Sequence, residues 1–154
     1  MRTKLTAIAA LAALAATLAA VAAAGPVATK QRVSIQVKDG APFVLTPLTP
    51  GAIKPDTGNA AFCCWTQRSI MRDGQAIDIN NPQWTLSGKL GTIEGRNLIG
   101  FVDLPDGWAV FTGTWKVTRG TGAYAGISGG GRVAGVALAN GKTRAQFEGF
   151  LKLK

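Results

Sequence analysis

Histidine is absent from this 154-residue chain, and acidic residues are scarce, with eight Asp and Glu against 17 Lys and Arg. Without an imidazole group, the chain has no Ser-His-Asp or Cys-His relay, no histidine-bound zinc and no imidazole general base. The sequence therefore points to no catalytic residue, no metal ligand and no cofactor. A role other than catalysis is the leading hypothesis.

Cysteine is nearly absent, and the two cysteines are adjacent, at Cys63 and Cys64. Neighbouring residues in a strand point to opposite faces, which excludes an ordinary bridge between them. Three interpretations stay open: a buried thiol that acts as a small hydrophobic group, which we favour, a vicinal disulfide with an eight-membered ring, and a bridge between two chains. A redox-catalytic role is not predicted, because the chain has neither a C-x-x-C motif nor a histidine to stabilise a thiolate.

The N-terminus has the three parts of a secretory signal peptide. Met1–Lys4 carries two positive charges, the uncharged Leu5–Val21 follows, and Ala22–Ala24 supplies small residues at the cleavage point. The run is short and weakly apolar for a membrane anchor. We expect a helical signal peptide over residues 1–24, whose removal leaves a single domain, residues 25–154, in the periplasm or outside the cell. The net charge of that domain is +9 − 2 = +7.

No segment after the leader favours a long helix, because twenty glycines are scattered among β-branched and aromatic residues. Apolar and polar residues instead alternate with period two at Val33–Lys38, Trp84–Gly91 and Arg144–Leu153, which predicts strands. We expect seven or eight strands in all. The four prolines within Ala41–Asn59 predict a long irregular loop at the rim of the fold.

Turn signals connect these strands. Asn140-Gly141 predicts a two-residue type I′ hairpin between Arg132–Ala139 and Lys142–Leu153. That register opposes Arg132 to Gly149 and puts the arginine on the face of Phe147, either inside the fold or at its mouth, where it reaches water. Glu94-Gly95 predicts a second turn, and Leu104-Pro105-Asp106-Gly107 a third.

The third turn also predicts which side chains share a face, because it places Leu104 opposite Trp108. Together with the other strands, it leads us to expect these residues to line the interior: Trp84, Phe101, Phe111, Trp115, Arg132 and Phe147. The opposite face is more apolar than a solvated surface and predicts a homo-oligomer interface. Its residues are Leu98, Val102, Trp108 and Val110.

An antiparallel meander of this size removes its exposed edges by closing on itself. Glycines inside the expected strands suit the bends that closure requires, at Gly88, Gly100, Gly113 and Gly135. We therefore predict an all-β fold, a seven- to eight-stranded antiparallel β-barrel.

A glycine-rich segment follows the expected strand that ends near Thr118. It lacks the Gly-Lys-Ser/Thr ending of a P-loop and the glycine spacing of a dinucleotide site. Residues 120–131, Gly-Thr-Gly-Ala-Tyr-Ala-Gly-Ile-Ser-Gly-Gly-Gly, resemble the strand–turn–strand signature of the allene oxide cyclase/dirigent-like barrel group, which includes many small secreted bacterial proteins. The resemblance covers about 45 residues, from Gly107 to just beyond Glu148.

That resemblance implies an eight-stranded barrel with a largely apolar cavity, often in a dimer or trimer, and members that guide cyclisation or radical coupling without a cofactor. In this chain the signature predicts a tight corner with positive φ, plugged by one tyrosine. Its residues are Gly120, Gly122, Tyr124, Gly126, Gly129 and Gly131. A lipocalin or avidin type of barrel is the alternative, since Gly113-Thr114-Trp115 matches the Gly-x-Trp tripeptide found there.

Three functions are compatible with these patterns. The leading one is a secreted binding or structural module whose interior holds either a small apolar ligand or nothing, the aromatic side chains then forming an ordinary core. The second is a cofactor-independent cyclase or isomerase that acts by confinement, with interior polar groups drawn from Glu94, Asn97, Asp103 and Arg132. The third uses the net charge of +7 to bind an acidic polymer or an anionic surface. The basic residues are too scattered for a nucleic-acid site, and membrane contact is expected only through an uncleaved leader.

Overall fold

The computed structural model describes residues 29–154, which form ten strands and one short 3-10 helix. The expected leader lies outside the described residues. In chain order the elements are β1 (Gln31–Val37), β2 (Pro42–Pro47), β3 (Asp56–Cys63), β4 (Gln67–Arg72), β5 (Gln75–Asn80), β6 (Gln83–Gly88), β7 (Thr92–Asp103), β8 (Ala109–Gly120), η1 (Gly122–Tyr124), β9 (Ser128–Ala137) and β10 (Thr143–Lys152). Within residues 29–154, the structure contains no helix with the length and hydropathy of a membrane span.

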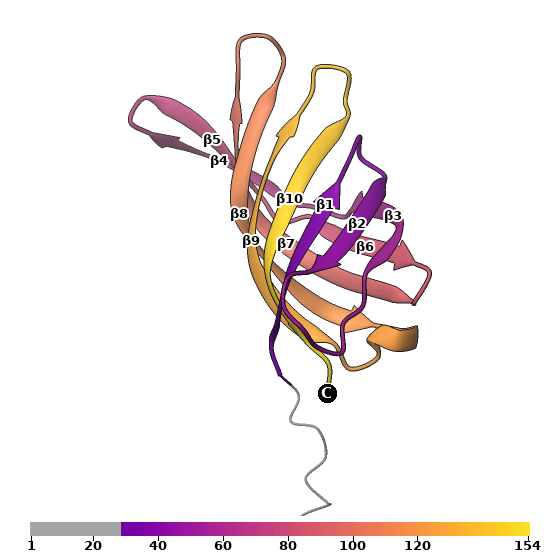
Figure 1. Cartoon of the computed structure of the whole chain (residues 1–154). Helices are drawn as coiled ribbons and strands as arrows, with labels where there is room; N and C mark the ends of the chain where they lie inside the picture. The colour runs from indigo at the N-terminus through magenta and orange to yellow at the C-terminus, as the bar shows by residue number, and fades with distance from the viewer. Residues whose placement is uncertain (1–28) are drawn as a thin grey trace, which may run out of the picture.

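Eight of the strands close into an antiparallel barrel (Figure 1). Their order around the wall is β7-β6-β3-β2-β1-β10-β9-β8, and β8 pairs back onto β7. The predicted all-β barrel is thus confirmed. Closure leaves these eight strands with a neighbour on both sides, which removes the unpaired edges of an open sheet.

The other two strands, β4 and β5, extend the wall beyond the barrel. The chain between β3 and β4 covers only residues 64–66, and that between β5 and β6 only residues 81–82. Since β3 pairs with β6 and β4 with β5, these four strands make one long, bent hairpin. Figure 1 shows its outer part, the β4–β5 arm, projecting away from the barrel. No described strand pairs with the outer edge of β4.

The prediction of an irregular loop over Ala41–Asn59 was wrong for most of its length. Residues 42–47 form β2, and β3 begins at Asp56. The two prolines of β2 occupy its first and last positions, where a missing N–H disturbs the ladder least. Only residues 48–55 stay irregular between the two strands.

The buried Gln31 side chain holds that irregular segment against the barrel. Its Nε2 donates to the carbonyl oxygens of Thr49 (2.8 Å) and Ile53 (3.0 Å), and its Oε1 accepts the Ile53 N–H (2.8 Å). Three hydrogen bonds from one amide replace the ladder that this segment lacks.

The turn at Leu104–Gly107 has the predicted register, with Phe101 opposite Phe111 and Asp103 opposite Ala109. The predicted turn at Glu94-Gly95 was wrong. The chain turns earlier, where the Gly88 N–H donates to the Gly91 carbonyl, and Glu94/Gly95 is an irregularity inside β7. Bulges and turns both favour glycine, and here the Trp84 ring lies where a Gly95 side chain would be.

The hairpin at Asn140-Gly141 has three loop residues instead of two. The Leu138 N–H donates to the Lys142 carbonyl (2.8 Å), and Gly141 has a φ of 78°, whereas Asn140 is not left-handed. A type I′ turn needs positive φ at both central residues, so this turn is of another type.

The extra loop residue shifts the register of β9 against β10 by one position. Arg132 therefore lies opposite Glu148, and Val133 lies opposite Phe147. Because a shift of one residue exchanges the two faces, Val133 is fully buried and Arg132 is exposed on the outer wall. The expectation that Arg132 faces the interior or the mouth was wrong.

Candidate functional site

A cavity of about 450 Å³ lies inside one end of the barrel. Gly40 and Gly141, from the β1–β2 and β9–β10 turns, are among its lining residues, so it lies at the end where these hairpins turn. None of the thirteen described residues that line it is charged. The others are Phe62, Trp65, Asn80, Pro82, Asn97, Ile99, Phe101, Phe111, Thr143, Ala145 and Phe147.

Aromatic rings form much of the wall. Phe101 and Phe111 face each other across the β7–β8 ladder, with ring centroids 4.9 Å apart. Gly135 lies opposite Phe111 on β9, and the Phe111 ring lies where a side chain of Gly135 would be. Ala145 continues the same row on β10. The Phe111 ring fills the space beside Gly135, whereas the small side chain of Ala145 lines the cavity.

Beside this space the interior is filled by three aromatic side chains. Trp84, Trp115 and Phe147 pack edge-on against one another, with centroids 6.0–6.3 Å apart. Phe147 lines the cavity, whereas both tryptophans are buried next to it. Of the six residues expected to line the interior, three therefore line the cavity, two pack against its wall, and Arg132 lies outside.

Asn97 is the one residue among the four proposed interior polar groups that lines the cavity. It is 4% exposed, and its Oδ1 accepts the Trp84 Nε1–H at 2.8 Å. Glu94 lies near Arg119, 3.8 Å away, in a solvent-exposed pair, and Asp103 is exposed at the end of β7. An amide does not titrate near neutral pH, so the described cavity wall contains no acid or base.

Asn80 is a second polar group of the cavity, and the sequence reasoning missed it. Its Oδ1 is buried and has no hydrogen-bond partner among the described residues. The available signal was the alternation of Ile77 and Ile79 with polar residues in a segment that follows Asp73-Gly74, a hairpin dipeptide.

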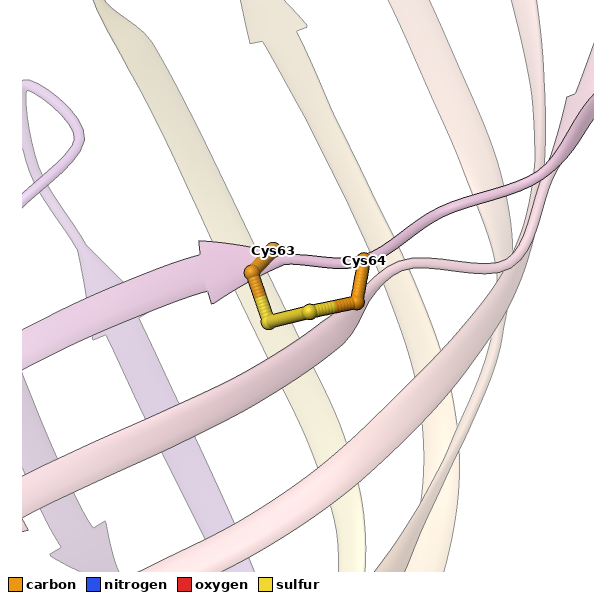
Figure 2. The surroundings of a disulfide bond; sticks show 2 residues. All are labelled: Cys63 and Cys64. Atoms are coloured by element: carbon orange, nitrogen blue, oxygen red, sulfur yellow. A yellow bond between two sulfur atoms is a disulfide. The ribbon is translucent and has the colours of Figure 1, made fainter.

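The two cysteines form a vicinal disulfide at the end of β3, which Figure 2 shows. Both are exposed, so the favoured interpretation as a buried thiol was wrong. The alternation rule did not apply, because Cys64 lies beyond the strand and has a φ of 57°. The disulfide lies in sequence between Phe62 and Trp65, two residues of the cavity wall. It therefore lies in the short segment between the end of β3 and the start of the β4–β5 arm.

The glycine-rich corner at residues 120–131 lies at the other end of the barrel, next to the start of β3. Residues 122–124 form η1, and Tyr124 is buried. The tyrosine Oη–H donates to the Asp56 carboxylate at 2.9 Å. The same carboxylate accepts three backbone N–H groups, those of Thr57, Lys89 and Leu90, at 2.8–3.3 Å.

These contacts shift both pKa values. Burial raises the pKa of Asp56, but the hydrogen bonds from Tyr124 and the three backbone groups outweigh burial, and the net pKa lies below the ordinary value. Burial and the neighbouring carboxylate both raise the pKa of Tyr124. Because all four donors satisfy Asp56, this pair fastens the end of the barrel and leaves no oxygen in need of a ligand.

Within residues 29–154, no cluster of three or more His, Cys, Asp or Glu side chains has the geometry to hold a metal ion. No family model, curated protein or solved structure matches this chain. The resemblance to the allene oxide cyclase/dirigent-like group therefore stays a prediction that depends on Gly120–Gly131. The site itself rests on the geometry of the cavity.

Proposed function

We propose that this protein is a non-catalytic binding module that holds a small apolar molecule in the end of its barrel. The observation that carries this proposal is the uncharged, aromatic-lined cavity of about 450 Å³. Cavities that take small molecules are about 300–1,000 Å³, mostly apolar, and carry a few polar groups that orient the ligand. Asn80, Asn97 and Thr143 contribute polar side chains to the lining here.

A small barrel of eight strands is ordinarily just wide enough for its own side chains to fill it. Here the cavity begins where Ala145, with a single methyl group as its side chain, takes a position of the inner wall. Two residues away along each strand, Val133 and Phe147 are buried. The small side chain at Ala145 therefore supports binding over a purely structural role.

A cyclase that acts by confinement is the alternative use of the same space. Of the polar groups considered for it, only Asn97 lines the cavity, and its oxygen already accepts the Trp84 N–H. An asparagine can orient a substrate but cannot serve as a proton donor or acceptor near neutral pH. The chemistry of the wall therefore favours binding.

The experiment is a fluorescence titration of the purified protein with the neutral dye N-phenyl-1-naphthylamine. We expect saturable binding at one site, lost in Ala145→Phe, which fills the cavity. Ala134→Phe is the matched control, because Ala134 is an exposed alanine on the outer wall and the added ring does not enter the interior. Thr143→Trp blocks the cavity from a half-buried position, and tests the same point if Ala145→Phe folds poorly. Absence of saturable binding, or equal binding by all variants, contradicts the proposal.

We also propose that a second copy of this chain covers the outer face of β7 and β8. Leu98, Trp108 and Val110 are 58%, 44% and 43% exposed on that face, and Val102 lies opposite Val110. The arm continues the face, since Ile79 of β5 lies opposite Gly100 and Ile70 of β4 is exposed. Contiguous exposed apolar side chains of this extent are typical of interfaces.

Sedimentation velocity tests the interface. We expect an oligomer for the native protein and a monomer for Leu98→Lys. Val44→Lys is the control, because Val44 is comparably exposed on β2. A monomeric native protein contradicts this second proposal and leaves the cavity unaffected.

A further inference from the structure

The positive charge of the described chain is concentrated at one end of the barrel. We call this the closed end, because the η1 corner covers it, and the cavity lies at the opposite, open end. Figure 1 shows the C-terminus at the closed end, away from the β7–β8 and β9–β10 turns. The closed end comprises residues 29–34, 46–58, 87–98, 114–132 and 148–154.

The two ends differ in net charge. The closed end contains ten Lys and Arg against three Asp and Glu, which gives a net charge of +7. The open end contains five of each kind and is neutral. Basic residues that are scattered along the sequence are therefore gathered by the fold. Nine of the ten are exposed, and Lys152 is half-buried, whereas one of the three acids, Asp56, is buried.

Most of these cations have no anionic partner. Among the ten, and within residues 29–154, only Arg119 forms an ion pair, with Glu94 at 3.8 Å. Arg96 and Lys116 lie directly opposite each other in the β7–β8 ladder, and like charges in such positions destabilise a sheet. An anion outside the chain would relieve this repulsion.

Exposed apolar side chains accompany the charge. Leu48 and Phe150 are each 47% exposed, and Leu90 is 37% exposed. The Leu48 N–H donates to the Arg32 carbonyl, and Phe150 lies opposite Arg32 in the β1–β10 ladder. Leu90 follows Lys89 in the β6–β7 turn. Leucine and phenylalanine beside lysine and arginine are typical of surfaces that rest on a lipid bilayer, where both kinds of side chain find a partner.

We propose that the closed end binds the surface of a bilayer that contains anionic lipids. The basic side chains lie near the headgroups, and Leu48 and Leu90, on two connections at the tip, reach the acyl chains. This proposal goes beyond ligand binding, and it differs from the sequence-based expectation that membrane contact occurs only through an uncleaved leader.

The length of the barrel fixes the orientation. Attraction to a charged bilayer decays over a Debye length, about 8 Å at physiological ionic strength. The ten residues of β10 separate Lys142 from Lys152 by about 30 Å along the strand. The open end therefore lies beyond the attraction, and the cavity opens away from the bilayer.

Co-sedimentation with vesicles tests the proposal. The purified protein is titrated with vesicles of phosphatidylglycerol and phosphatidylcholine in equal amounts, and with vesicles of phosphatidylcholine alone. We expect binding to the anionic vesicles, weakened as the salt concentration rises, and little binding to the neutral ones. Absence of binding to the anionic vesicles, or equal binding to both kinds, overturns the proposal.

Two pairs of exposed lysines give variants of equal net charge. Lys54→Gln with Lys89→Gln, at the closed end, should weaken vesicle binding about thirtyfold, since each lysine near the surface contributes about fivefold. Lys38→Gln with Lys142→Gln, at the open end, is the matched control and should change binding by about twofold at most. Circular dichroism checks that each variant is folded. Equal losses in the two pairs overturn the proposal, because total charge alone would then explain binding.

Leu48→Asn distinguishes a bilayer from an acidic polymer. It should weaken vesicle binding about fivefold, because a half-exposed leucine loses its contact with the acyl chains. Leu104→Asn is the control, since Leu104 is 40% exposed at the open end. Neither change should alter binding to poly-L-glutamate. If Leu48→Asn leaves vesicle binding unchanged, the closed end recognises acidic polymers through charge alone, and the bilayer proposal is overturned.

Discussion

The two ends of this barrel differ in how completely a buried polar side chain is hydrogen-bonded. At the closed end, the Asp56 carboxylate accepts four hydrogen bonds, one of them from Tyr124. At the open end, the buried Asn80 Oδ1 accepts none from the described residues. Both residues lie at a strand terminus, Asp56 beginning β3 and Asn80 ending β5. Three of the four donors to Asp56 come from the segments that cover the closed end, and only Thr57 belongs to a strand.

The closed end is covered by segments distant in sequence. The η1 corner brings Tyr124 to Asp56 over 68 residues, and the β6–β7 turn brings Leu90, whose carbonyl also accepts the Ala123 N–H. At the open end the β4–β5 arm leaves the barrel at the level of the vicinal disulfide. A buried group whose partners come from the fold supports stability, whereas one without such partners carries an uncompensated desolvation cost.

The largest effect is expected at the closed end. Asp56→Asn should lower the free energy of unfolding by about 3 kcal/mol, because an amide nitrogen would face N–H groups that need an acceptor. Urea denaturation measures the change. Asp103→Asn is the control, because Asp103 is exposed at the end of β7 and should cost about 0.5 kcal/mol at most. Equal losses of stability in the two variants would show that the hydrogen bonds of Asp56 do not stabilise the closed end.

The pH dependence of stability should also come from the closed end. The lowered pKa of Asp56 stabilises the fold above about pH 4, and this contribution is lost as the pH falls further. The raised pKa of Tyr124 stabilises the fold below about pH 10, and this contribution is lost as the pH rises further.

Tyr124→Phe tests the alkaline part. It should cost about 1 kcal/mol at neutral pH and abolish the loss of stability above about pH 10. Tyr124 is the chain's only tyrosine, so the absorbance of tyrosinate during an alkaline titration reports this residue alone. Titration at the ordinary pKa in the folded protein would contradict the described contact.

The smallest effect on stability is expected from the vicinal disulfide. Cys63→Ser combined with Cys64→Ser should change the free energy of unfolding by about 1 kcal/mol or less, because the bridge closes no intervening loop. Dye binding should weaken more visibly, by about threefold, as Phe62 and Trp65 lose their fixed spacing. Native protein treated with a dithiol should match the variant. A large loss of stability would show that the disulfide stabilises the whole fold, and would contradict a role limited to the cavity entrance.

Local signals predicted much of the fold. The register of β7 on β8 followed from a single turn at Leu104–Gly107, since alternation carries a correct turn along both strands. The same method failed at Asn140-Gly141. One extra loop residue shifts the register there, so that the side chain of Val133 faces the interior instead of that of Arg132. The Asp39-Gly40 and Asp73-Gly74 turns, by contrast, have positive φ at both residues. A dipeptide thus indicates a hairpin better than it indicates the length of its loop.

The candidate site was predictable only in part, for the same reason. The aromatic rings at Phe101, Phe111 and Phe147 were found because alternation assigns a face to each residue. Asn80 and Asp56 were missed, because being unpaired or fully paired depends on distant segments. The disulfide was misjudged because Cys64 lies outside the strand whose geometry was assumed.

The sequence by itself determined that this chain forms antiparallel strands with one apolar face each, because period-two alternation and glycine-rich turns act over a few residues. Only the tertiary structure decided that eight strands close while two project, that the interior stays empty at one end, and which polar atoms remain without partners. Those outcomes depend on contacts between residues far apart in the chain, and local propensities contain no information about such contacts.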